Sequence, residues 1–333
     1  MKKINYIFVI LFVSVMFASC GKKALTDEFG CYFNYDDAVE LAGKKKQPML
    51  VLFTSEGDDD LSNQYVNGIL KDSSFQKNIV SKYSVLHADF SQKAFEKSNA
   101  DGNATEAEKE LANTYTNIIQ NNYNLAILFN IIEMPAAFLC TPEGYVVCRL
   151  DENRSFSTIS ELETAIAENL TSLERINNLV AETKKGNYLN KVDAVDAVFV
   201  ATDPAYRSFL MPLINYALAL DPNNDSGLCG QFILSIAESK AIMAYAQGDV
   251  EAAIEAYLVA ADNSYLKAEQ KQECLYTAAY IVTASGSDDN EGILEYLKLA
   301  YQFAPESIKA PAIQSAIDYF TTLVESDSEI DAE

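Results

Sequence analysis

The chain has 333 residues, with 25 lysines and arginines against 48 aspartates and glutamates, and a formal net charge of −23. A charge of that sign repels phosphate backbones, so the composition argues against nucleic-acid binding and against a polybasic lipid-binding surface. The length predicts two domains, taking roughly 150 residues for each, and 49% hydrophobic residues suffice to bury two cores.

The first residues have the pattern of an export signal. Lys2 and Lys3 form a charged start, and the apolar segment 6–16 follows. That segment is shorter than the roughly 20 residues that span a bilayer. Residues 1–19 are therefore predicted to be a cleaved signal peptide.

A cysteine directly follows this predicted signal peptide. Ala18 and Ser19 precede Cys20, and this pattern resembles the lipobox of bacterial lipoproteins. The resemblance implies lipidation of Cys20 and a lipidated tether over 20–33. Gly21 in the next position favours the outer membrane, with the periplasmic or surface face left open. An ordinary cleaved signal with an incidental cysteine is the alternative.

The next part of the chain alternates between helical and strand patterns. Apolar residues at helical spacing predict a helix over 36–46, which Pro48 ends. The apolar run 49–53 predicts a buried strand, and alternation over 83–90 predicts a second one. Between them lie the acidic loop 56–60 and further helical turns.

The pattern then continues to a closing helix. Residues 91–105 are polar and are interpreted as an inserted loop, and 106–130 as a helix. A Thr-Pro-Glu-Gly turn joins two predicted strands, 137–140 and 145–148. The helix over 156–170 closes this part.

This order resembles the thioredoxin-like superfamily over residues 34–170. Phe53 and Thr54, the Thr-Pro-Glu-Gly hairpin and the Met134–Pro135 pair carry the resemblance. It implies an α/β thioredoxin-like domain in which Pro135 is cis and faces the loop after the first strand. In active relatives that loop carries Cys-x-x-Cys, whereas this chain has Asp59-Asp60-Leu61-Ser62.

Residues 171–325 read as an all-α domain. Three stretches, 213–224, 247–257 and 291–305, resemble parts of tetratricopeptide repeats. A generic helical bundle is the alternative to this tetratricopeptide-like helical domain. The acidic residues 326–333 are interpreted as a frayed tail.

The cysteines after the lipobox do not form a redox motif. Their number is odd, and none has a partner at Cys-x-x-Cys spacing. Buried small hydrophobic side chains are the favoured interpretation, while one structural disulfide or a redox pair are the alternatives. The residues are Cys31, Cys140, Cys148, Cys229 and Cys274.

Two polar features allow more than one interpretation. The acidic loop can cap the following helix or, as the alternative, bind a cation such as Ca²⁺. His87 is the only histidine, and we expect it to be packed in its strand instead of serving in a triad or metal site. No catalytic residue, metal site or cofactor is predicted.

These patterns favour a non-catalytic envelope lipoprotein that acts as a scaffold or adaptor for an unknown protein or peptide partner. One expected surface is the concave face of the helical repeats. The other is a peptide-binding groove. The alternative is a thiol-disulfide oxidoreductase or isomerase that uses non-standard cysteines. The groove is expected to comprise Asp58, Asp59, Asp60, Leu61, Met134 and Pro135.

Overall fold

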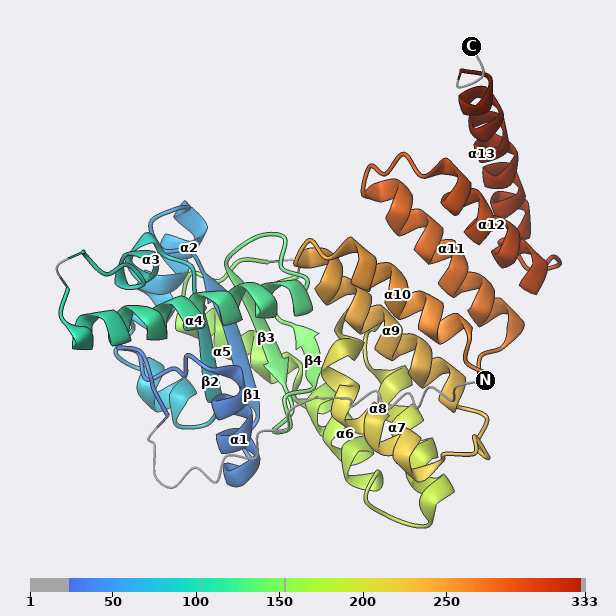
Figure 1. The fold of residues 1–333 in the computed structure, drawn as a ribbon. Coiled ribbons are helices and arrows are strands. Elements are labelled where there is room, and N and C mark those ends of the chain that lie inside the picture. Colours follow the sequence, from blue (N-terminus) through green and yellow to red (C-terminus); the bar gives the residue numbers. More distant parts are fainter. Residues whose placement is uncertain (1–23, 103, 153, 331–333) are drawn as a thin grey trace.

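The structure, a computed structural model, describes residues 24–102, 104–152 and 154–330. The predicted signal peptide and the predicted lipidation site Cys20 lie outside the described residues. A mixed α/β region comes first in the chain and an all-helical region follows it (Figure 1). Among the described helices, none combines the length and the apolar character needed to cross a membrane.

The α/β region is built on a four-stranded sheet with the order β2-β1-β3-β4. Strand β1 is parallel to β2 and antiparallel to β3, and β3 is antiparallel to β4. A parallel pair joined to an antiparallel hairpin in this order resembles the thioredoxin fold. The strands are β1 (Met49–Thr54), β2 (Ser84–Asp89), β3 (Ala136–Cys140) and β4 (Val146–Arg149).

One face of the sheet carries Leu50 and Leu52, because alternate side chains of a strand point to opposite faces. Gly68 allows a close approach on this side, since a Cβ there would lie 1.8 Å from the carbonyl oxygen of Ser157. The helices packed on this face are α2 (Asp60–Tyr65), the π-helical turns η1 (Val66–Leu70) and η2 (Gln76–Val80), and α5 (Ile159–Glu168).

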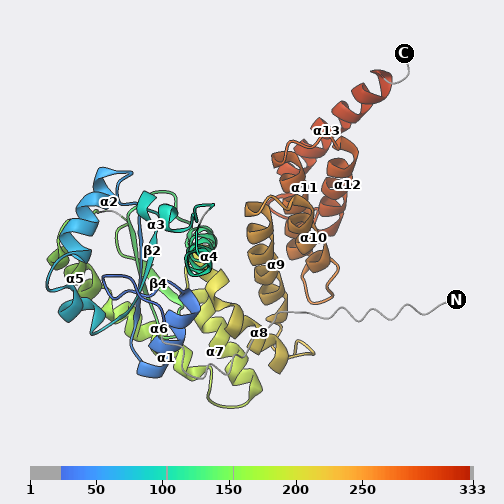
Figure 2. The ribbon, with the colours of Figure 1, turned by 60° about the vertical axis from the view of Figure 1, so that its left-hand side comes forward.

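The other face carries Met49, Val51 and Phe53, all fully buried. Helices α1 (Tyr35–Lys45) and α4 (Glu106–Leu128) cover this face. Figure 2 shows the sheet between α4 on one side and α2 and α5 on the other. The predicted strands and the helix over 106–130 are therefore confirmed, with small shifts at their ends.

The prediction of a loop over 91–105 is wrong for its first part. Helix α3 (Gln92–Lys97) lies within it. The Ser91 side chain accepts a hydrogen bond from the Ala94 N–H at 3.2 Å and caps the helix. Ala94 is buried, and the ring of Phe95 lies 6.4 Å from that of Tyr123 in α4, between centroids, so these apolar contacts and one cap hold a short helix in a polar segment.

The helical region begins at α6, so the predicted domain boundary at 170–171 falls at the first residue of that helix. The last helix continues to Ile330, into the predicted tail over 326–333. The elements are α6 (Leu170–Glu182), α7 (Tyr188–Ala201), the 3₁₀ segment η3 (Pro204–Leu210), α8 (Met211–Leu220), α9 (Cys229–Ala246), α10 (Val250–Ala261), α11 (Ala268–Ala284), α12 (Asn290–Phe303) and α13 (Ala310–Ile330).

Helices α9–α13 form an arm that extends away from the sheet (Figure 2). Each helix packs against the next one along the chain, and they share one apolar core. Ala253, Ala278 and Ala300 are fully buried in it. Small side chains at these positions let the helices approach closely.

Aromatic rings connect the sheet to the helical region. The ring of Phe129, just after α4, lies 4.7 Å from that of Phe138 in β3 and 4.4 Å from that of Phe209 in η3, between centroids. Tyr145, from the turn before β4, joins the core formed by α6–α9. The two regions therefore share buried apolar surface.

Candidate functional site

The peptide bond between Met134 and Pro135 is cis, as the resemblance to thioredoxin-like proteins predicted. Pro135 directly precedes β3, which begins at Ala136. Among the described residues, the N–H and C=O groups of Met134 have no hydrogen-bond partner. An unpaired backbone beside a strand is free to pair with another extended segment.

A groove of about 380 Å³ lies beside Pro135 and is called the Pro135 groove below. Apolar side chains from three parts of the chain meet in it. Leu61 comes from α2, Phe156 precedes α5, and Ile132 and Met134 precede the cis bond. Leu61 and Ile132 are exposed, whereas Phe156 is buried.

The structure brings together some of the predicted groove residues but not all. Leu61, Met134 and Pro135 line the Pro135 groove, whereas Asp58, Asp59 and Asp60 do not. Asp58 is exposed in the loop. Asp60 lines a separate shallow hollow with Asn63 and Asn67, because successive residues at the start of a helix point in different directions.

Asp59 caps α2, at the position that the resemblance to thioredoxin-like proteins assigns to the first cysteine of Cys-x-x-Cys. Its Oδ1 accepts a hydrogen bond from the Ser62 N–H at 2.6 Å, and its Oδ2 accepts one from Ser55 Oγ at 2.6 Å. Burial raises the pKa of Asp59, but these hydrogen bonds outweigh it and lower that pKa below its ordinary value. The capping interpretation of the acidic loop is confirmed for Asp59.

The same resemblance assigns the second cysteine to the position of Ser62. The Ser62 side chain is fully buried, and its Oγ accepts a hydrogen bond from the Ser55 N–H at 3.1 Å. Asp59, Ser55 and Ser62 thus form one hydrogen-bonded unit that closes the loop. This unit places a carboxylate at the tip of the helix, where thiol chemistry requires a thiolate.

Charged side chains also line the Pro135 groove. Arg149 is paired with Asp151 through two contacts, Nε to Oδ1 at 3.1 Å and Nη2 to Oδ2 at 3.2 Å. Arg154 is paired with Glu168 at 2.7 Å. Both arginines of the groove are therefore neutralised within the chain.

The groove also holds acidic side chains without such partners. Glu133 and Glu152 line it and are exposed. Neither has an ion pair among the described residues. The uncompensated charge at the groove is therefore negative.

Tyr65 lines the same groove with a buried hydroxyl that has no hydrogen-bond partner in the described chain. Burial, together with the charge of Asp151, raises the pKa of Tyr65 well above its ordinary value. The hydroxyl therefore stays protonated. Its ring packs against Phe156, with centroids 6.5 Å apart.

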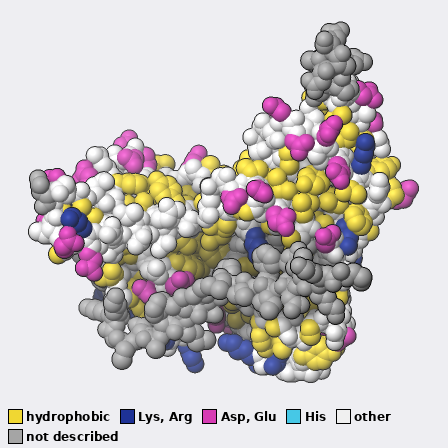
Figure 3. Space-filling model, in the orientation of Figure 1, with side chains coloured by type: hydrophobic (Ala, Val, Ile, Leu, Met, Phe, Trp, Pro, Cys, Tyr) yellow, Lys and Arg dark blue, Asp and Glu magenta, His cyan; other side chains and the backbone are white. Residues whose placement is uncertain are grey.

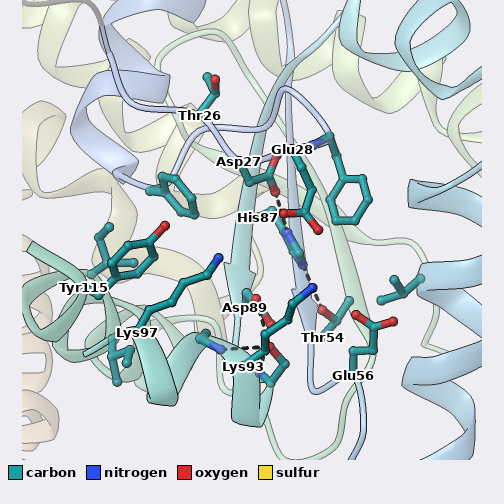
Figure 4. Close-up of a pocket in the computed structure, with 17 residues that line it drawn as sticks. Thr26, Asp27, Glu28, Thr54, Glu56, His87, Asp89, Lys93, Lys97 and Tyr115 are labelled. Carbon is teal, nitrogen blue, oxygen red and sulfur yellow. Dashed lines mark hydrogen bonds and ion pairs between the residues drawn. The ribbon is translucent and has the colours of Figure 1, made fainter. Parts of the chain in front are cut away.

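A second pocket, of about 130 Å³, lies at the carboxyl ends of β1 and β2 (Figure 4). A chain of three hydrogen-bonded side chains crosses it. His87 Nδ1 lies 2.8 Å from Asp27 Oδ2, and His87 Nε2 lies 2.8 Å from Thr54 Oγ1. His87 is buried in its strand, as predicted.

These three side chains have the carboxylate-imidazole-hydroxyl order of a catalytic triad, an arrangement that the sequence did not indicate. However, the Thr54 side chain is fully buried, so its hydroxyl is not presented to a substrate. Asp27 lies in the predicted tether, and it is so far from His87 in the sequence that no local pattern indicates their contact. The arrangement attaches the segment around Asp27 to β2, where the backbone of Tyr32 also pairs with Val85 and His87.

The rim of this second pocket is polar. Lys93 and Lys97 extend from α3 toward it (Figure 4), and the Lys97 amine lies 5.2 Å from the centroid of the Tyr115 ring.

In the part of the chain that the structure describes, no three His, Cys, Asp or Glu side chains are grouped to hold a metal ion.

The five described cysteines are free thiols. Cys140 belongs to the core on the α1 side of the sheet and Cys148 to the α5 side, so these two point away from each other. Burial, with the charge of Glu152, raises the pKa of Cys148 to about 11. Burial also raises the pKa of the other four thiols: Cys31, Cys140, Cys229 and Cys274.

Comparisons with known proteins give partial matches. Residues 228–326 match a family model described as "Uncharacterised protein C-terminal domain". A protein of Treponema pallidum (strain Nichols), titled "Uncharacterized protein", is 31% identical over 106 residues. That match covers 32% of this chain and 35% of the relative, so the chain spans about a third of the relative's length.

A solved structure titled "DsbH Oxidoreductase" is similar over 45% of this chain and 96% of its own chain, with 18% identity and a TM-score of 0.29. The helical part of the chain is thus similar to a domain family, and the α/β part has the strand order of a thioredoxin-like fold.

Proposed function

We propose that this protein is a non-catalytic scaffold that binds an extended peptide segment of a partner protein in the Pro135 groove. The observation that carries the proposal is the unpaired backbone of Met134 at the edge of an apolar groove. A peptide that pairs with this backbone adds a strand there, and its alternate side chains enter the groove.

The thiol chemistry supports this proposal over the oxidoreductase alternative. The helix tip carries the Asp59 carboxylate, and the position of a resolving thiol carries the buried hydroxyl of Ser62. The remaining thiols have raised pKa values, whereas thiol exchange requires a thiolate.

The proposal includes a place in the cell. The lipobox-like sequence before Cys20 supports attachment to the bacterial outer membrane through lipid chains. The successive packing of α9–α13 supports a tetratricopeptide-like array. Its concave face is then a second surface for the partner.

The test uses the full-length protein in detergent. Random octapeptides on a display library are selected against it, and the enriched peptides are measured by fluorescence anisotropy. Leu61→Asp and Ile132→Asp are expected to weaken binding about tenfold or more, because each puts a charge where an apolar side chain of the peptide packs. An N-methyl group at the central amide of the peptide is expected to weaken it similarly.

Ile308→Asp is the matched control, since Ile308 is 98% exposed and lies just before α13, outside the groove. It is expected to leave affinity unchanged. The proposal is wrong if no peptide is enriched, or if the enriched peptides bind the Leu61 and Ile132 variants as tightly as the parent protein.

A further inference from the structure

We infer that the segment bound in the Pro135 groove carries a large apolar side chain flanked by lysine or arginine residues. This inference depends on the proposed function, because it names the chemistry of the peptide that the same groove receives. It rests on two properties of the groove: its exposed apolar side chains and its uncompensated charge.

The apolar requirement comes from Leu61 and Ile132. The side chain of Ile132 is 83% exposed and that of Leu61 is 50% exposed, although both are large and apolar. They come from separate parts of the chain and line one groove with Pro135. An apolar side chain placed between them removes both surfaces from water, which favours binding.

The basic requirement comes from the charges that remain unpaired. Arg149 and Arg154 are held by carboxylates of the chain itself, so they offer little to an acidic peptide. Glu133 and Glu152 line the groove without such partners. Glu133 directly follows Ile132 in the chain. A basic side chain of the peptide that neighbours the apolar residue packed on Ile132 therefore lies near the Glu133 carboxylate.

The geometry of an extended peptide allows both requirements to be met. Successive residues rise about 3.3 Å and point to opposite sides. A residue whose side chain enters the groove is therefore flanked, two positions away on either side, by residues whose side chains also point toward the groove, where Glu133 and Glu152 are exposed lining residues. Lysine and arginine at these flanking positions complement the two carboxylates, whereas glutamate is repelled.

The net charge of the whole molecule also favours binding of a basic peptide. This charge is −23, and acidic side chains outnumber basic ones over the visible part of the face in Figure 3. A field of this sign attracts a basic segment and speeds its encounter with the groove, with an effect that salt screens.

The test compares three octapeptides with the same central phenylalanine, flanked by lysines, by glutamines or by glutamates. The lysine peptide is expected to bind the full-length protein about tenfold or more tightly than the glutamate peptide at about 50 mM salt. The difference is expected to shrink at about 500 mM salt, because these charges are exposed.

A double variant, Glu133→Gln with Glu152→Gln, assigns the effect to the groove. It is expected to reduce the preference for lysine over glutamine several-fold. The matched control is Glu255→Gln with Glu295→Gln, two exposed acids in α10 and α12. It changes net charge equally and is expected to keep most of the preference.

The outcomes separate the two proposals. If the glutamine and glutamate peptides bind as tightly as the lysine peptide, and Ile132→Asp weakens all three, the basic requirement is wrong and the groove remains the binding site. Loss of preference in the control double variant equal to that in the groove variant also overturns the inference. If none of the three binds while peptides enriched from the display library do bind, the inferred chemistry of the peptide is wrong and the groove remains the binding site; if no library peptide is enriched either, both proposals fail.

Discussion

Asp27 Oδ2 lies 2.8 Å from His87 Nδ1, although 60 residues separate them in the chain. The other oxygen of the same carboxylate, Oδ1, accepts hydrogen bonds from the N–H groups of Phe29 and Cys31, at 2.9 and 2.8 Å. One buried carboxylate therefore shapes a turn in the segment before α1 and attaches that turn to β2.

Asp27→Ala is expected to lower the free energy of unfolding by about 2–4 kcal/mol. The substitution leaves the buried His87 ring nitrogen and two backbone N–H groups without their acceptor. Urea denaturation, followed by circular dichroism at pH 7, measures the change.

Glu28→Ala is the control for this prediction. Glu28 is the next residue, is exposed, and makes no hydrogen bond or ion pair through its side chain among the described residues. Its replacement is expected to change the free energy of unfolding by about 0.5 kcal/mol or less. Equal effects of the two substitutions would show that the Asp27–His87 contact does not stabilise the fold.

The charge of Asp59 is expected to make stability depend on pH. Its folded-state pKa is lowered, so its contribution is present above the unfolded-state pKa of about 3.9 and is lost as pH falls through the folded-state pKa. Asp59→Asn is therefore expected to cost on the order of 0.3–1 kcal/mol at pH 6–7. The cost is expected to disappear below roughly pH 3.

Denaturation curves for the parent protein and Asp59→Asn, measured across that pH range, test this expectation. Asp58→Asn serves as the control, because Asp58 is exposed and its side chain does not cap the helix. A difference between parent and Asp59→Asn that stays constant from pH 7 to pH 3 would contradict the role assigned to the charge.

The thiols of the folded protein are expected to react slowly with iodoacetamide. With a pKa of about 11, only about one Cys148 side chain in a thousand is a thiolate at pH 8. Mass spectrometry of peptides alkylated for minutes at that pH, with and without urea, measures the protection. Rapid alkylation of Cys140 or Cys148 in the folded protein would favour the oxidoreductase alternative.

Local patterns were sufficient to predict the sheet, whereas much of the groove was predicted from a family resemblance. The apolar run around Val51 and the alternation around His87 arise because these strands are buried. Burial selects apolar residues, so it is visible in the sequence itself. The cis bond before Pro135 followed from a family resemblance and not from residue spacing. Leu61, Met134 and Pro135 were predicted together for the same reason.

Other features depend on contacts between distant segments and leave no local pattern. Asp27 was assigned to a tether because nothing near it indicates His87 as its partner. Helix α3 was missed because only one of its side chains, Ala94, is buried. The groups that give the Pro135 groove its charge, Arg149 with Asp151 and the unpaired Glu133, can be identified only once their neighbours are known.

The packing of Phe209 against Phe129 has a consequence for how the molecule is handled in the laboratory. Separating the chain near residue 170 would expose an apolar surface around Phe129 on the first fragment. It would also expose the ring of Phe209 to water on the second fragment. Each half produced alone is a candidate for aggregation, so the intact polypeptide is the proper object of biochemical work.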